Sequence, residues 1–165
     1  MKHIAYIAIG SNMGNPRDNC IEAIREISKN ASIKIISKSS FYQTSPIGPI
    51  EQEWFINSAI KINTSLTPIK LLTNLLNIES TMGRVRKEKW GPRLIDLDLL
   101  FYDNQILNEK KITIPHPEIS KRNFVLIPLC EIAANLNHPT LKKSIKTLLQ
   151  ESTDNAKVNK LNSTL

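Results

Sequence analysis

Two aspartates, Asp96 and Asp98, have the types and spacing best suited to chemistry in this 165-residue chain. They lie in an apolar run, DLDLLFY, that is typical of a strand, where residues two apart share a face. Leu97, Leu99 and Phe101 then point to the other face and are expected to be buried. Two adjacent carboxylates repel each other unless positive charge lies beside them. The pair therefore predicts either salt bridges to arginines or a Mg²⁺ site, because Mg²⁺ prefers carboxylate and phosphate oxygens.

A strongly cationic segment, GRVRKEKWGPR, directly precedes this strand. Guanidinium and ammonium groups bind phosphate oxygens through charge-assisted hydrogen bonds. A carboxylate pair beside such a segment is the equipment of a phosphoryl-transfer site. Trp90, within the segment, is expected either to stack on a ligand or to anchor the loop on the core. The cations of the segment are Arg84, Arg86, Lys87, Lys89 and Arg93.

The elements that must position these groups follow from the spacing of apolar residues. Two helices are expected, each with a capping residue followed by proline, which are Asn15 before Pro16 and Thr67 before Pro68. Strands are expected over the two aspartates and at residues 3–9, 33–42 and 55–63. The order strand, helix, strand, strand, helix, strand predicts a ferredoxin-like βαββαβ core of the α+β class. Its helices would pack on a mainly antiparallel sheet, followed by a C-terminal extension.

The second helix is expected to bury a leucine stripe made of Leu72, Leu75 and Leu76. Gly83 suits the C′ position just past the helix end, where a left-handed backbone favours glycine. Glu79, one turn beyond the stripe, is expected to pair with an arginine of the cationic segment.

The C-terminal extension carries weaker patterns. A short hairpin is expected at residues 105–114 and a helix at residues 124–134. A last amphipathic helix is expected over residues 141–149. From residue 151 onward we expect a loose polar tail. The whole chain, residues 1–165, has the size of one domain.

Composition limits the class of protein. No apolar run approaches the ~20 residues of a membrane span. No signal-peptide cleavage pattern follows Met1, so a cytoplasmic protein is expected. Cys20 and Cys130 lie far apart and are expected to be buried thiols.

The formal net charge of +7 suits an anionic partner such as a nucleotide or RNA. An RNA-binding module of the same fold is therefore one alternative. Against it, the predicted strands lack an exposed aromatic platform, because Tyr6 and Phe55 are scattered. Another alternative is a different Mg²⁺-dependent nucleotidyl or phosphoryl transferase, since two aspartates with cations serve many phosphate donors.

Three separated blocks resemble the signature of the 6-hydroxymethyl-7,8-dihydropterin pyrophosphokinase family of folate biosynthesis. They occur in the family's order. The blocks are R-x-R, W-G-P-R and D-L-D within residues 84–98, F-Y-x-T, P-x-G-P and F-I-N within residues 41–57, and His116 with Arg122 and Phe124.

The resemblance implies the same fold and an enzyme that transfers pyrophosphate from ATP to the pterin hydroxyl, releasing AMP. It also implies two Mg²⁺ ions held by Asp96 and Asp98, with Arg84 and Arg93 as catalytic residues beside them. The ATP contacts that it implies are Glu79, Arg84, Arg86, Lys89, Trp90, Arg93, Ile95, His116 and Arg122. The pterin contacts that it implies are Thr44, Ser45, Pro46, Ile47, Phe55, Asn57 and Phe124.

Plainer readings stay open for several of these residues. Asn57 could be an exposed or backbone-bonded amide, and His116 a structural histidine on a stiff loop. Arg122 could be a surface arginine and Phe124 a core side chain.

The chain also departs from the resembled pattern at single positions. Leu76 stands where a nucleotide-contacting Gln is common, and Phe55 stands where Tyr is common. Pro117 replaces an aromatic residue, and Lys89 replaces an Arg. The expected partners are small molecules, ATP and the pterin, with no nucleic acid or membrane partner. We expect a monomer, with neighbouring folate-pathway enzymes as associated or fused proteins.

Overall fold

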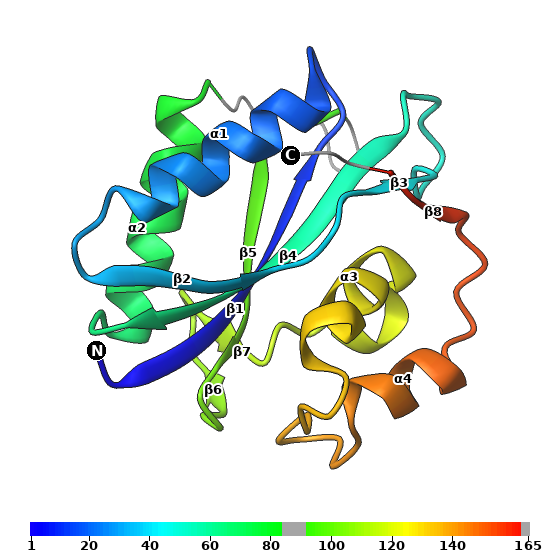
Figure 1. The fold of residues 1–165 in the computed structure, drawn as a ribbon. Coiled ribbons are helices and arrows are strands. Elements are labelled where there is room, and N and C mark those ends of the chain that lie inside the picture. Colours follow the sequence, from blue (N-terminus) through cyan, green and yellow to red (C-terminus); the bar gives the residue numbers. More distant parts are fainter. Residues whose placement is uncertain (84–91, 163–165) are drawn as a thin grey trace.

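The computed structural model describes residues 1–83 and 92–162. In this part of the chain, a twisted antiparallel sheet carries helices on both faces (Figure 1). The helices are α1 (Pro16–Ser28), α2 (Pro68–Thr81), α3 (Asn123–Ala133) and α4 (Ile145–Glu151). The strands of the main sheet are β1 (His3–Ser11), β2 (Ile33–Lys38), β3 (Tyr42–Thr44), β4 (Phe55–Thr64), β5 (Asp96–Tyr102) and β8 (Val158–Lys160).

The sheet order is β5-β1-β4-β3-β8, with β2 also paired to β4, and all of these pairings are antiparallel. The predicted ferredoxin-like α+β core is therefore confirmed. A separate hairpin joins β6 (Leu107–Asn108) to β7 (Thr113–Ile114), as expected. A short 3-10 helix, η1 (Ile119–Lys121), leads into α3.

One strand prediction is wrong, because residues 33–42 form two strands rather than one. The register of β2 against β4 shifts between Ile35 and Ser37, and the strand ends at Lys38. At the break, the backbone N–H of Ser40 donates to the Glu131 carboxylate of α3 at 2.7 Å. A side chain 91 positions away in the sequence thus accepts a hydrogen bond that the Ser40 N–H would otherwise be free to donate to a neighbouring strand.

Helices α1 and α2 cover one face of the sheet and begin at the predicted caps (Figure 1). The Asn15 side chain accepts from Asp18 N, and that of Thr67 accepts from Lys70 N. Gly83 has a φ of +89° just past α2, as its predicted C′ position requires. Apolar side chains of β1, β4 and β5 fill this face, including Ile7, Ile9, Ile60, Ile62, Leu97 and Leu99.

The predicted leucine stripe of α2 is partly wrong. The helix buries Leu71, Leu75 and Ile78 together with Glu79, whereas Leu76 is 48% exposed. Spacings of four and three residues place Leu71, Leu75 and Ile78 on one side of the helix, and Leu76 lies about 100° around from Leu75. Leu76 therefore points to solvent although its side chain is apolar.

Helices α3 and α4 pack on the opposite face, where Tyr6, Ala59 and Leu100 join side chains of α3 in a second apolar cluster. Phe101 belongs to this cluster as well, whereas Leu97 lies in the cluster on the other face. The prediction from alternation that the two residues share a face is therefore wrong. A register shift in the β1–β5 pairing, between Tyr6 and Ile7, leaves Leu100 as an extra residue. Such a bulge reverses the alternation beyond it.

The C-terminal extension differs from expectation in two ways. The last helix starts only at Ile145, after its N-cap Ser144, and Leu141 lies outside it, 43% exposed. The expected loose tail is also wrong for the described residues, because β8 pairs with β3 as an edge strand. The chain continues this pairing to Leu161, whose N–H donates to Phe41 O at 2.9 Å.

The described helices are all too short or too polar to span a membrane. Both cysteines are free thiols. Cys20 is fully buried, as predicted, and burial raises its pKa to about 12. Cys130 is only half-buried, so the prediction of a buried thiol is wrong at that position.

Candidate active site

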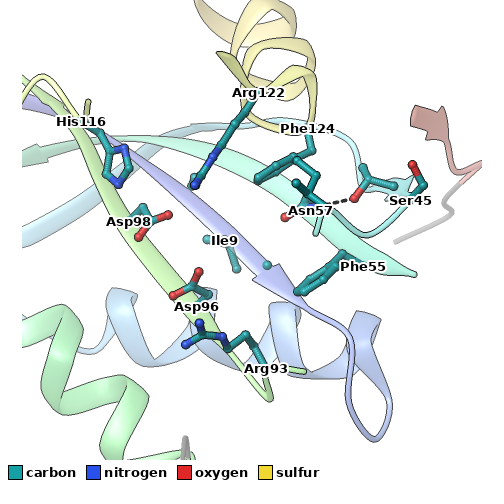
Figure 2. Close-up of a pocket in the computed structure, with 14 residues that line it drawn as sticks. Ile9, Ser45, Phe55, Asn57, Arg93, Asp96, Asp98, His116, Arg122 and Phe124 are labelled. Carbon is teal, nitrogen blue, oxygen red and sulfur yellow. Dashed lines mark hydrogen bonds between the residues drawn. The ribbon is translucent and has the colours of Figure 1, made fainter. Parts of the chain in front are cut away.

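A cavity of about 280 Å³ opens on the α3 face, near the ends of β4 and β5 (Figure 2). In Figure 2 the carboxylates lie on one side of it and the aromatic rings and amide on the other, with Arg122 reaching in from α3. Its lining residues are Ala8, Ile9, Gly10, Thr44, Ser45, Ile47, Phe55, Asn57, Arg93, Asp96, Asp98, His116, Arg122 and Phe124.

The two aspartates project from the same face of β5 into this cavity, as strand alternation predicts. Both are half-buried. Their cross-strand partners on β1 are the smallest side chains available, since Asp96 faces Gly10 and Asp98 faces Ala8. Small neighbours leave open space beside the carboxylates, where oxygen-ligated groups can enter.

His116 lines the same side of the cavity, above Asp98 in Figure 2. Its backbone N–H donates to Leu100 O at 3.0 Å, which fixes the loop to β5. Its Nδ1 accepts from Glu118 N at 3.2 Å, so the proton of the neutral imidazole sits on Nε2. Burial, and then the nearby Arg122 guanidinium, lower the pKa of His116. The ring is therefore a neutral donor at neutral pH.

Arg122 and Phe124 come from the start of α3. The Arg122 guanidinium carbon lies 5.5 Å from the centre of the Phe124 ring, a cation–π distance that orients both side chains. Both line the cavity, and Phe124 also packs against the apolar cluster under α3, so their ligand contacts stay predictions.

Asn57 is 7% exposed and its amide is fixed in one orientation. Its Nδ2 donates to Thr44 Oγ1 on β3 at 2.7 Å, which leaves Oδ1 as the acceptor above Gly10. A methyl group at Gly10 would lie 2.5 Å from that oxygen, too close for any Cβ. Gly10 therefore makes room for the Asn57 amide, a role that no local sequence signal reveals.

Asn12, 4% exposed, ties together three segments around the cavity. Its Nδ2 donates to Gln52 Oε1 and to Glu53 O, each at 2.9 Å. Its Oδ1 accepts from Arg93 N at 2.8 Å, and its own N–H donates to Arg93 O at 2.9 Å. No local sequence signal reveals these contacts, because a side chain's long-range partners cannot be inferred from local pattern.

The structure gathers most of the predicted site residues but not all of them. Pro46 lies between two lining residues without lining the cavity itself. Ile95 is fully buried in the core on the α1 and α2 face, and Glu79 is 3% exposed on α2. Neither lines the cavity, so their ATP contacts stay predictions. Four further predicted ATP contacts lie outside the described residues, namely Arg84, Arg86, Lys89 and Trp90.

The donor set fits a hard cation that shares its ligands with a substrate. Within residues 1–83 and 92–162, no cluster of three or more His, Cys, Asp or Glu side chains could cage a metal ion. Asp96 and Asp98 nevertheless present two carboxylates to the cavity. Mg²⁺ commonly takes one or two carboxylates and completes its shell with phosphate oxygens and water.

Comparison with known proteins identifies the family of this chain. The family model for 7,8-dihydro-6-hydroxymethylpterin-pyrophosphokinase (HPPK) matches residues 6–134. The chain belongs to this family. A Haemophilus influenzae relative, 2-amino-4-hydroxy-6-hydroxymethyldihydropteridine pyrophosphokinase, is 42% identical over 158 residues, which cover 96% of this chain and 98% of the relative. The resemblance stated from three sequence blocks is thereby confirmed.

Longer relatives of the HPPK family exist. The Lactococcus lactis subsp. cremoris bifunctional protein FolKE is 41% identical over 130 residues, covering 79% of this chain and 37% of that protein. A solved structure of Plasmodium falciparum HPPK-DHPS, wild type with STZ-DHP, aligns with a TM-score of 0.72 at 15% identity. That alignment covers 92% of this chain and 43% of the longer one, and it supports the fold.

Proposed function

We propose that this chain, as an HPPK-family enzyme of folate biosynthesis, transfers pyrophosphate from ATP to the hydroxyl of 6-hydroxymethyl-7,8-dihydropterin. The observation that carries this is a cavity with two chemically different halves. The half lined by Phe55, Asn57 and Phe124 suits a flat heterocycle with hydrogen-bonding edges. The half lined by Asp96 and Asp98 suits phosphate groups and their counterions.

In the heterocycle half, the fixed amide of Asn57 would read the pterin edge. Its Oδ1 can accept from a ring N–H, because Nδ2 already donates to Thr44. Phe55 and Phe124 offer aromatic surfaces on which the rings can stack. The remaining contacts to the pterin would come from Thr44, Ser45, Pro46 and Ile47.

In the phosphate half, the chain's own groups would stabilise charge as the pyrophosphoryl group moves. A bond forms between the pterin hydroxyl oxygen and the β-phosphorus. The bond from that phosphorus to the α,β-bridging oxygen breaks, AMP leaves with this oxygen, and the hydroxyl proton is released. Arg93 and Arg122 would hold the negative oxygens, and His116 would donate from Nε2. Arg84, Arg86, Lys89, Trp90, Glu79 and Ile95 are proposed as the further ATP contacts.

Asp96 and Asp98 would hold Mg²⁺, and the family resemblance implies two ions. When bound, the ions would neutralise the triphosphate and lower the pKa of the attacking hydroxyl. The carboxylates contribute by sharing one face of a rigid central sheet, next to the small side chains of Ala8 and Gly10. This placement keeps both carboxylates oriented toward the cavity before any ligand arrives.

A product assay tests the proposal. The protein is incubated with ATP, Mg²⁺ and 6-hydroxymethyl-7,8-dihydropterin, and the products are separated by chromatography. We expect one AMP for each pterin pyrophosphate formed, and no AMP when the pterin is omitted. Accumulation of ADP would indicate another phosphoryl transferase, and absence of any pterin-dependent turnover would overturn the assignment.

The remaining proposals concern the state of the protein. We propose that residues 1–165 act as a single pyrophosphokinase domain, a monomer in the cytoplasm, with small molecules as its partners. The fused relatives support an association with neighbouring folate-pathway enzymes. Measuring the molar mass in solution by light scattering tests the monomer.

A further inference from the structure

Helix α3 receives its N-terminal cap from the C-terminal segment of the chain. Arg122, its own N-cap residue, makes no side-chain capping bond. Instead, Asn123 N donates to Asp154 Oδ2 at 2.7 Å, and Asn123 Nδ2 donates to Asp154 O at 3.0 Å. A carboxylate in this place satisfies an open backbone N–H and interacts favourably with the helix dipole. The cap thus holds the first turn of α3, which carries Arg122 and Phe124.

The same segment holds the opposite wall of the cavity. Lys157 N donates to Ser45 Oγ at 2.9 Å, and Ser45 N donates to Lys157 O at 2.9 Å. Directly after this pair of bonds, β8 aligns Val158 with Thr44 of β3. Ser45 and Thr44 both line the heterocycle half of the cavity.

Only Asn155 and Ala156 lie between the two attachments, at Asp154 and Lys157, so the link between the walls is short. It is also stiffened internally, because Ala156 N donates to Asp154 Oδ1 at 2.9 Å. The Asp154 carboxylate therefore caps α3 with Oδ2, and with Oδ1 it holds the backbone of the segment that leads to β8. The family match covers residues 6–134, and the segment lies beyond it.

We infer that residues 152–161 form a strap that sets the spacing between β3 and the start of α3. Within this strap, Asp154 is a positioning residue for the pterin. The inference rests on the proposed function, because it assumes that the pterin binds between these walls. Asp154 acts through Phe124 and Ser45, which are proposed to contact the pterin. Loss of its cap should weaken pterin binding more than it weakens nucleotide binding.

The test compares Asp154→Ala, Asp154→Asn and Thr67→Ala with the wild type. Thr67→Ala removes the cap of α2, on the other face of the sheet, and controls for the loss of a helix cap as such. We measure the Kd of the pterin by calorimetry, with a non-hydrolysable ATP analogue and Mg²⁺ present. Hydrogen exchange is measured in the ligand-free proteins, at the amides of residues 42–46 and 123–127.

For Asp154→Ala we expect the pterin Kd to rise about five- to tenfold, since small misplacements of a binding group are costly. Exchange should accelerate at both walls. Asp154→Asn keeps an oxygen that can accept from Asn123 N, and its Kd should stay within about twofold of wild type. Thr67→Ala should change neither quantity at these walls.

An unchanged pterin Kd in Asp154→Ala would overturn the strap's role in binding, and unchanged exchange at either wall would overturn the strap itself. A wild type that binds nucleotide but never the pterin would instead overturn the proposed function. In that case hydrogen exchange still decides whether Asp154 couples the two walls. The two failures are therefore distinguishable.

Discussion

The two faces of the sheet use the same strands for opposite purposes. The face under α1 and α2 is filled mainly with apolar side chains. The face under α3 is apolar where that helix packs and polar where the helix begins, at the cavity. Neighbours on β5 show the contrast, since Leu97 is 3% exposed in the core and Asp98 lines the cavity. Substitutions on the face under α1 and α2 should therefore change mainly the stability of the protein. Substitutions in the polar part of the α3 face should change mainly its activity.

The largest effect is expected from the polar half. Asp98→Ala should lower kcat/KM by about 10³-fold or more, the scale seen when a charge-stabilising group is lost. The melting temperature should stay equal or rise, because a carboxylate repulsion is removed. Steady-state kinetics and thermal melting check this, with Asp98→Asn as the isosteric control. A loss of kcat/KM of less than tenfold would contradict the claim that the polar part of the α3 face governs activity.

The next effect is expected on the closed face. Leu97→Ala should lower the free energy of unfolding by about 2–4 kcal/mol, through lost burial and the cavity left behind. The kcat of the folded protein should change by less than about twofold, which is ~0.4 kcal/mol in the activation barrier. The reason is that Leu97 belongs to the core under α1 and α2 and does not line the cavity. Leu76→Ala, on the exposed side of α2, is the matched control and should stay within about 0.5 kcal/mol. Urea unfolding measures both; equal losses in the two variants would contradict the assignment of faces.

Gly10→Ala tests the part of the cavity that holds the Asn57 amide. The new methyl group must displace the Asn57 amide, whose Oδ1 it would approach to 2.5 Å. We expect the pterin Kd to rise about tenfold, about 1.4 kcal/mol, while the Kd of an ATP analogue changes little. Calorimetry with each ligand separates the two. Equal weakening of both ligands would mean that Gly10 serves the whole cavity rather than the Asn57 amide.

The smallest effect is a pH dependence from His116. Because burial and Arg122 lower its pKa in the folded state, the unfolded chain binds the proton first as pH falls. His116 therefore contributes stability above its unfolded pKa of 6.5, and this is lost as pH falls through the window below 6.5. His138 acts in the same direction, so His116→Gln should reduce the slope only in part. An NMR titration of the ligand-free protein giving His116 a pKa above 6.5 would contradict this.

Local pattern was sufficient for much of the fold. Capping residues and apolar spacing located α1 and α2, and alternation placed Asp96 and Asp98 on one face. It failed where distant segments intervene. The bulge at Leu100 reversed the side of Phe101, and the Glu131 carboxylate helped to divide residues 33–42 into two strands.

The site shows the same division. The predicted residues that line the cavity belong to recognisable blocks, and most of them carry a charge, an amide or an aromatic ring. The residues that were missed, Gly10 and Asn12, act through partners on other strands and loops. Strand β8 has three residues, too few for alternation to be visible, and it forms because β3 offers an open edge. Such roles depend on the assembled sheet and cannot be found from local pattern.

The central claim is that pterin and nucleotide meet around Asp96 and Asp98, and calorimetry tests it most directly. A non-hydrolysable ATP analogue with Mg²⁺ is titrated first, and the pterin second, into wild type and Asp96→Ala. We expect wild type to bind both, with pterin binding dependent on nucleotide, and Asp96→Ala to lose the Mg²⁺-dependent part. Mg²⁺-dependent binding that is unchanged in Asp96→Ala would contradict the account.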